Sequence, residues 1–158
     1  MRERARPISM YGQVQDLPVL EWAWAEERLV AAPLYWVVAA SNGWPHPRPV
    51  WGVWHRSLLH VSLGSPVLIR SLDADGRVSV HLESATDVVV VEGHAVPSDD
   101  EASAIASYDA KYEYTYDVAR YGPLVSVAPI RVLAWSAGGY AGRQGFVSAG
   151  AWEFAAHD

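Results

Sequence analysis

Short apolar runs separated by turn residues make up most of the chain. Six of these runs have the length and the β-branched or aromatic composition of strands: 34–40, 49–55, 58–62, 77–83, 87–96 and 130–135. They follow one another without long helical segments between them, which favours antiparallel pairing over a doubly wound parallel sheet. The pattern therefore predicts a mainly β protein with inserted helices, built as a six-stranded antiparallel barrel.

Three other segments have helix signals. The first, 18–32, repeats apolar residues at helical spacing and is ended by Pro33. The second, 64–76, begins with Ser65 as a capping residue and has a proline at the first helical position. The third begins at 98–101, where a serine and a glutamate have the spacing of a capping box. One stripe of this third helix is predicted to be apolar: Ala102, Ile105, Tyr108 and Tyr112.

Turn residues indicate how the first strands connect. Asn42-Gly43 joins the first two strands as a tight hairpin, and Arg56-Ser57 is a two-residue connection to the third, so a meander is predicted. Gly93 is expected to mark a bulge in the valine-rich strand. Three prolines of the second strand region cannot donate to a ladder, so this end is predicted to lie at an edge, a bulge or a rim: Pro45, Pro47 and Pro49.

Length and charge narrow the class of protein. The 158 residues predict one domain over 1–158, with an N-terminal arm at 1–16. The net charge of −6 and the scattered basic residues argue against a nucleic-acid partner. The absence of cysteine excludes disulfides and thiolate chemistry. No apolar run has the roughly 20 residues of a membrane span or the flanks of a signal peptide, so a cytoplasmic protein with no membrane partner is expected.

The common catalytic motifs do not occur in this sequence. There is no nucleophile elbow, H-E-x-x-H zinc motif or P-loop. The six histidines lack the spacing of a metal site, so no metal is predicted, and most are interpreted as hydrogen-bonded or solvent-facing strand residues. The eight tryptophans and eight tyrosines are typical of a core or an interface, and some are candidates to line a flat ligand. Because the chain has no cysteine, redox chemistry would depend on a bound cofactor.

One group of residues has the chemistry of an anion site. The start of the helix at 64–76 offers unpaired N–H groups, the Ser65 hydroxyl and the positive end of the helix dipole, which suit a phosphate. Arg48 on the neighbouring strand and Arg70 one turn into the helix are candidates to complete the site. Trp51 lies within reach of a ring system attached to that phosphate. The alternative, from the spacing alone, is that Ser65 only caps the helix and that the two arginines form surface ion pairs.

These residues lie in segments that resemble the pyridoxamine 5′-phosphate oxidase-related FMN-binding split-barrel family. "GWPHPR" (43–48) is similar to the family's G-x-P-x-x-R stretch, and "SLGS" (62–65) to the segment after its next strand. "RSLDADGRVSVHLE" (70–83) resembles its helix-to-strand passage. Three further segments resemble the actinobacterial branch of flavin and deazaflavin oxidoreductases: "VVVVEGHA" (88–95), "YDAKY" (108–112) and "RVLAW" (131–135). The resemblance covers residues 18–154.

The resemblance implies a six-stranded split barrel that forms a homodimer, with the cofactor at the subunit interface and in contact with both chains. Arg48 would contact the cofactor phosphate. The backbone of Pro49, Val50 and Trp51 would line the isoalloxazine ring. A proline-rich corner would then fix the strand against which the cofactor lies.

Further contacts are implied from the next strand and from two helices. Val61, Ser62 and Ser65 would lie along the ribityl chain and the phosphate. Arg70 is expected to substitute for the basic pair that the family's oxidase carries directly after the serine. Lys111 is a candidate contact from the third helix, and the alternative is that its side chain is solvated.

The implied function is that of an oxidoreductase acting on an unknown small organic substrate with FMN or, alternatively, a deazaflavin coenzyme. "SAGAWEF" (148–154) lacks the arginine with which the family's oxidase holds its substrate phosphate, so vitamin B6 phosphate is not the expected substrate. Hydride transfer to or from a flavin ring needs no dedicated acid or base, which agrees with the lack of a recognisable catalytic group. A non-catalytic split barrel that binds flavin or haem is the alternative, and a ligand-free interaction module is a third.

Overall fold

The computed structural model describes residues 18–96, 98, 100–137 and 146–154, so the predicted arm at 1–16 lies outside the described residues. The elements are, in chain order, α1 (Trp22–Ala31), β1 (Tyr35–Ser41), β2 (Trp44–Val50), β3 (Gly52–His55), β4 (Leu58–Val61), α2 (Pro66–Asp75), β5 (Arg77–His81), β6 (Asp87–Val96), α3 (Glu101–Tyr112), α4 (Val118–Tyr121), β7 (Val125–Ser136) and β8 (Ser148–Glu153). Within these ranges, no helix is long and apolar enough to cross a membrane.

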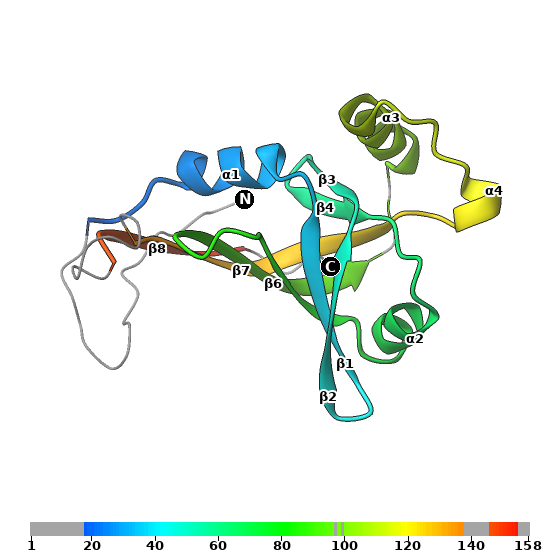
Figure 1. Cartoon of the computed structure of the whole chain (residues 1–158), viewed down its shortest axis with the longest axis horizontal. Coiled ribbons are helices and arrows are strands. Elements are labelled where there is room, and N and C mark those ends of the chain that lie inside the picture. The colour runs from blue at the N-terminus through cyan, green and yellow to red at the C-terminus, as the bar shows by residue number, and fades with distance from the viewer. Residues whose placement is uncertain (1–17, 97, 99, 138–145, 155–158) are drawn as a thin grey trace.

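The strands form one antiparallel sheet of eight strands. Seven follow the order β2-β1-β5-β6-β7-β4-β3, and β8 pairs with β7 beside this path. Figure 1 shows the sheet curled, with α1 along one side and α2, α3 and α4 near one end. A row of valines crosses four adjacent strands and is fully buried: Val37, Val80, Val91 and Val132. The predicted mainly β, antiparallel fold with inserted helices is confirmed.

The two end strands of the path, β2 and β3, are consecutive in the chain and are separated only by Trp51. The strand predicted at 49–55 is therefore divided into two parts that lie at opposite ends of the sheet path. Each part keeps its expected partner, because β2 pairs with β1 and β3 pairs with β4. The meander is thus confirmed, with a bend in its middle strand at Trp51.

The sheet has two strands more than the six predicted. One is added by the division at Trp51, because the pairing of β2 begins as early as Trp44. The other is β8, which pairs with β7 from Ser148 to Glu153. Its sequence, SAGAWE, is dominated by alanine and glycine, which are weak strand formers, so only the long-range pairing reveals it.

Both predicted two-residue turns have the backbone of tight hairpins. Asn42 and Gly43 have φ values of 51° and 79°, and Arg56 and Ser57 have φ values of 50° and 62°. Two successive positive φ angles are the mark of the type I′ turn, whose twist matches that of the flanking strands. The register of β6 with β7 shifts at Gly93, so the predicted bulge is confirmed.

The prolines of β2 occupy every second position of an edge strand. Pro45, Pro47 and Pro49 lie opposite Ala40, Val38 and Trp36 of β1. In an antiparallel ladder, alternate residues point their N–H groups toward the partner strand, and the others point them away. Because the pairing of β2 with β1 is continuous, the missing N–H groups fall on the outer side of the sheet, as predicted for an edge.

Helix α1 covers one side of the core. It begins at Trp22 rather than at the predicted residue 18, because Pro18 and Leu20 pair with Ala149 of β8. The Leu20 N–H donates to the Ala149 carbonyl at 2.9 Å, and the Ala149 N–H donates to the Pro18 carbonyl at 3.1 Å. The Trp22 ring packs edge-on against Trp152, with ring centroids 5.4 Å apart. This contact joins the helix to the last strand.

Helix α2 is capped as predicted, but α3 is not. The capping box at 98–101 is wrong, because the N-cap of α3 is Asp100 and the structure shows no side-chain hydrogen bond at this cap. Three of the four residues of the predicted stripe do pack in a buried cluster with Ala104, namely Ile105, Tyr108 and Tyr112, whereas Ala102 is exposed.

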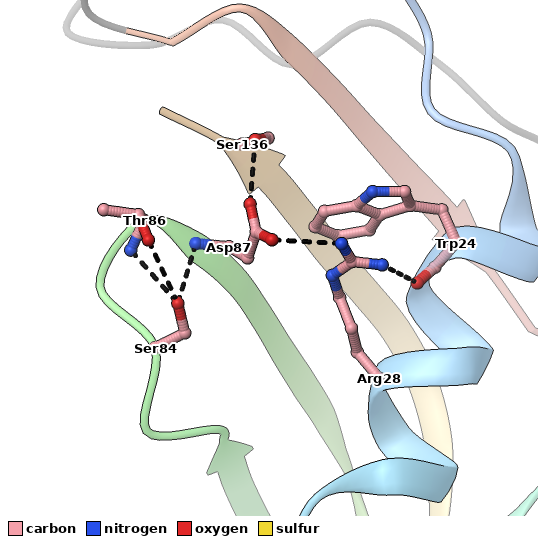
Figure 2. Close-up of polar contacts among 6 residues, drawn as sticks. All are labelled: Trp24, Arg28, Ser84, Thr86, Asp87 and Ser136. Carbon is pink, nitrogen blue, oxygen red and sulfur yellow. Dashed lines mark hydrogen bonds and ion pairs between the residues drawn. The ribbon is translucent and has the colours of Figure 1, made fainter. Parts of the chain in front are cut away.

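An arginine on α1 fixes the helix to the sheet. Arg28 donates from Nη2 to the Asp87 carboxylate of β6 at 3.0 Å and from Nη1 to the Trp24 carbonyl at 3.0 Å, while its guanidinium lies 3.5 Å from the centre of the Trp24 ring. Ser136 of β7 donates to the other carboxylate oxygen at 2.8 Å. Figure 2 shows these contacts, together with the bond from the Asp87 N–H to Ser84. The hydrogen bonds from Arg28 and Ser136 lower the pKa of Asp87.

We expect Arg28→Ala to lower the free energy of unfolding at pH 7 by about 0.5–1 kcal/mol, because the ion pair is partly exposed and screened by solvent. Since the pKa of folded Asp87 is depressed, its contribution is present above the usual carboxyl pKa of about 4 and is lost as the pH falls through the folded value. Urea unfolding of both proteins at pH 7 and pH 3 measures this. An equal difference at both pH values would contradict the role of Asp87.

Candidate functional site

A cavity of about 550 Å³ lies between the β2–β3 bend, the β4–α2 connection and the segment from α3 to α4. Six of the nine residues predicted for the site line it: Arg48, Pro49, Val50, Trp51, Ser62 and Ser65. Bends and loops bring these residues together from two separate stretches of chain. The candidate site predicted from the sequence therefore coincides with a cavity.

The three other predicted residues do not line this cavity. Val61 is fully buried in the core beside the lining residue Ser62. Arg70 is exposed on α2, one turn beyond the start of the helix. Lys111 lies on α3 with its ammonium group directed at the bend between β2 and β3, where it donates to the Gly52 carbonyl at 2.7 Å.

Trp51 presents a partly open aromatic surface to the cavity. Its side chain is 50% exposed, and its ring stacks on Tyr112 with centroids 4.7 Å apart and planes 12° apart. Tyr114 meets the same ring edge-on at 6.2 Å. The Ser62 N–H donates to the Trp51 carbonyl at 3.0 Å, which holds two walls of the cavity together. Trp51 is thus a supported indole with free surface for a planar ring.

Arg48 supplies the positive charge of the cavity. Its side chain is exposed, and one guanidinium nitrogen donates to the Pro47 carbonyl at 2.7 Å. Among the described residues it has no carboxylate partner, and no carboxylate lines the cavity. Because a guanidinium has five N–H donors, most of them stay available for an anion.

The start of α2 adds neutral donors to the same wall. Ser65 is the N-cap residue, and its hydroxyl oxygen accepts a hydrogen bond from the Leu68 N–H at 3.3 Å. The hydroxyl hydrogen is then free to donate, and the helix dipole favours negative charge at this end. Pro66 and Val67 follow, so this turn has no cation of its own. Gly64 leaves open space beside the cap.

Four tyrosines form the wall opposite the strands: Tyr108, Tyr114, Tyr116 and Tyr121. The Tyr116 hydroxyl donates to the Gly122 carbonyl at 3.1 Å and lies 3.3 Å from Ser62 Oγ. The Tyr114 hydroxyl donates to that of Tyr121 at 3.1 Å. Burial raises the pKa of Tyr108 to about 12, so this phenol stays neutral at physiological pH. From the sequence, Tyr108 was placed in an apolar stripe and in the YDAKY segment. The close spacing of Tyr112, Tyr114 and Tyr116 was an available signal for two of the other wall residues, but Tyr121 had none.

Two strand histidines near α3 are hydrogen-bonded, as predicted for most histidines of the chain. The His55 ring lies between Ser103 and Ser107 of α3, at 2.9 and 3.1 Å from their hydroxyl oxygens. His60 is 2% exposed and lies 2.8 Å from Ser126 Oγ, and burial lowers its pKa. Within the described parts of the chain, no three His, Asp or Glu side chains are grouped to hold a metal ion.

Comparisons with known proteins place this geometry among known folds. No family model matches the chain, and no curated protein matches its sequence. Among solved structures, a FAD-binding protein from Mesorhizobium loti is 15% identical, with a TM-score of 0.55 over 98% of this chain and 100% of its own. A FAD-binding protein from Mycobacterium smegmatis is 16% identical, with a TM-score of 0.53 over 87% of this chain and 100% of its own. An F420 reductase is 18% identical, with a TM-score of 0.53 over 67% of this chain and 94% of its own.

At these identities the likeness establishes the fold. The structural match extends over nearly the whole length of each of these three proteins. The chain therefore has the split-barrel fold of the flavin-binding proteins that its sequence resembles.

Proposed function

We propose that this protein binds a flavin-type cofactor, FMN or a deazaflavin, in the cavity beside Trp51 and uses it as an oxidoreductase on a small organic substrate. The observation that carries the proposal is the pairing of a half-exposed indole with an arginine that has no carboxylate partner in the described chain, both at one cavity. This combination suits a flat ring with an anionic tail.

The donor set fits the anionic tail of such a cofactor. Arg48 offers charged N–H donors, and Ser65 offers a hydroxyl at the positive end of a ten-residue helix. None of the described residues that line the cavity is a carboxylate that would repel a phosphate. Arg70, which lies outside the lining, would contribute charge at longer range or through a change of rotamer.

The remaining lining fits the ring. Trp51 would stack against it, while the tyrosines would provide apolar surface with hydroxyl groups at the rim. A volume of about 550 Å³ is within the usual range of small-molecule sites. A flavin or deazaflavin supplies hydride-transfer chemistry when it is bound, and the residues of this chain would hold and orient it. Among the described residues no histidine or carboxylate lines the cavity, so a proton that the substrate requires would come from a tyrosine hydroxyl or from water.

We also propose that two copies of the chain form a homodimer with the cofactor between them. The cavity is bordered by half-exposed aromatic side chains, namely Trp51, Tyr114 and Tyr121. Exposed aromatic surface of this kind is typical of interfaces. A second subunit would cover the open side of the cavity and exclude water from the ring.

The direct test is a titration of the purified protein with FMN, FAD and a deazaflavin coenzyme, followed by absorbance and by cofactor fluorescence. We expect saturable binding of at least one of them, with its fluorescence quenched by stacking on Trp51. Trp51→Leu should bind more weakly and leave the bound cofactor brighter, whereas Trp36→Leu, on the outer face of β1, should behave as wild type.

Two outcomes separate the alternatives. In the first, the protein binds a cofactor that neither accepts hydride from the donors tested nor passes it to the acceptors tested. That result would support a flavin-binding protein without catalysis. Uptake of none of the three cofactors by the dimeric or monomeric protein would contradict the proposed function.

A further inference from the structure

The bend at Trp51–Gly52 is clamped from two sides. On one side it is pressed against β4: a Cβ atom on Gly52 would lie 2.7 Å from the His60 carbonyl oxygen. On the other side, side chains of α3 form hydrogen bonds with both the N–H and the carbonyl group of Gly52. The Gly52 N–H donates to the Tyr112 hydroxyl at 2.9 Å, and the Gly52 carbonyl accepts from Lys111 Nζ at 2.7 Å.

The Tyr112 hydroxyl is shared between two carbonyl groups. It lies 2.8 Å from the Gly52 carbonyl oxygen and 2.9 Å from that of Pro33, but a hydroxyl has one proton to donate. Because Lys111 already donates to Gly52, the hydroxyl proton is available to Pro33, directly after α1. The ammonium group therefore decides how the hydrogen bonds at the bend are distributed.

Lys111 also begins a chain of hydrogen bonds to α1. Its ammonium group donates to the Tyr35 hydroxyl at 3.2 Å, and that buried hydroxyl donates to the Leu29 carbonyl at 2.6 Å. The ammonium lies 4.7 Å from the centre of the Tyr35 ring and 5.1 Å from that of Tyr112. Its described hydrogen-bond partners are thus neutral oxygens and its other neighbours are aromatic faces.

The groups that face Lys111 are phenols and a carbonyl, from β1, β3 and α3. No acidic group of the described residues acts on it, and burial alone lowers its pKa to about 8. A half-buried cation without a carboxylate partner costs free energy, so it adds little to stability. What it does supply is N–H donors to the Gly52 carbonyl and to the Tyr35 hydroxyl at the same time.

We propose that Lys111 is a positioning residue: by holding the Gly52 carbonyl and the Tyr35 hydroxyl, it fixes the Trp51–Gly52 bend and with it the plane of the indole that faces the cofactor. The effect on cofactor binding rests on the proposed function, but the positioning of Trp51 by Lys111 is a property of the protein without cofactor. Tyr112 completes the arrangement, because its hydroxyl bonds Gly52 and its ring supports the rear face of Trp51.

The chain offers an unusually direct test, because Lys111 is its single lysine. Labelling with ¹³C-lysine gives one side-chain signal, and 5-fluorotryptophan gives one ¹⁹F signal per indole, with that of Trp51 assigned from Trp51→Phe. In cofactor-free protein, we expect the Trp51 signal to change with pH at the same midpoint, about 8, as the Lys111 signal. In Lys111→Met and Lys111→Gln, the Trp51 signal should be shifted and should no longer follow this titration.

Cofactor binding is measured on the same proteins. Lys111→Met should raise the dissociation constant about tenfold, the effect expected if the indole is in the binding-competent orientation only about a tenth of the time. Arg77→Met, which removes an exposed arginine paired only with Asp75 in the described structure, is the matched control and should leave both readouts unchanged.

The outcomes distinguish this inference from the proposed function. A Trp51 signal that is the same in wild type, Lys111→Met and Lys111→Gln would overturn the positioning role, whatever the cofactor affinity. A wild-type protein that binds no flavin or deazaflavin, but whose Trp51 signal follows Lys111, would overturn the proposed function and retain the positioning role.

Discussion

Gly52→Ala is expected to destabilise the protein by about 3 kcal/mol, as overpacking of a rigid core does. The added methyl group would lie 2.7 Å from the His60 carbonyl oxygen, 2.9 Å from Val61 Cγ1 and 3.2 Å from the Tyr35 ring. All three neighbours are fixed, since Val61 and Tyr35 are fully buried and the His60 carbonyl belongs to β4. Relief therefore requires the backbone of β3 to move away from β4.

Urea unfolding followed by far-UV circular dichroism measures this effect. The matched control is Gly64→Ala, since a Cβ atom there meets nothing within 4 Å and the residue does not have a positive φ. Its stability should lie within about 0.5 kcal/mol of wild type. Equal midpoints for Gly52→Ala and Gly64→Ala would contradict the close packing of β3 against β4.

The second large effect is expected at Arg48. If its guanidinium binds the cofactor phosphate, Arg48→Ala should weaken FMN binding by about 1.5–3 kcal/mol, the contribution of a charged hydrogen bond. The loss should shrink as salt is added, because the group is exposed. Arg48→Lys should recover only part of the affinity, because an ammonium group lacks the planar fork of the guanidinium.

Riboflavin makes this prediction specific. It has the same ring and ribityl chain as FMN but no phosphate, so Arg48→Ala should leave its dissociation constant unchanged. Arg77→Ala, at an exposed arginine outside the cavity lining, should affect neither ligand. If Arg48→Ala weakened FMN and riboflavin equally, the phosphate would have to lie elsewhere.

Local sequence patterns correctly predicted the elements that depend mainly on their own residues. The valine-rich strand was predicted with the bounds that β6 has, and Asn42-Gly43 and the Ser65 cap were placed correctly. Elements that depend on distant partners were missed. The strand β8 exists because it pairs with β7, and α1 starts late because the preceding residues pair with that same strand.

The residues of the candidate site also divide into those with a local sequence signal and those that only distant contacts bring to the cavity. Arg48, Trp51 and Ser65 were predicted because a strand corner and a helix cap give local signals. The tyrosine wall was not predicted, because its members reach the cavity only when the segment from α3 to α4 folds over the β2–β3 bend. Lys111 was a candidate contact for the cofactor, with a solvated side chain as the alternative, and the structure places its ammonium group on the Gly52 carbonyl, outside the cavity lining.

The spacing of the prolines in β2 also bears on the protein's behaviour in concentrated solution. Exposed edge strands promote aggregation, because a neighbouring molecule extends the sheet through their free N–H and C=O groups. On the outer side of β2, every residue from 45 to 49 that would present an N–H is a proline. This edge therefore offers acceptors without donors, and an incoming strand would gain too few hydrogen bonds to add itself. The prolines thus protect the β2 edge of the sheet against strand addition by a second molecule.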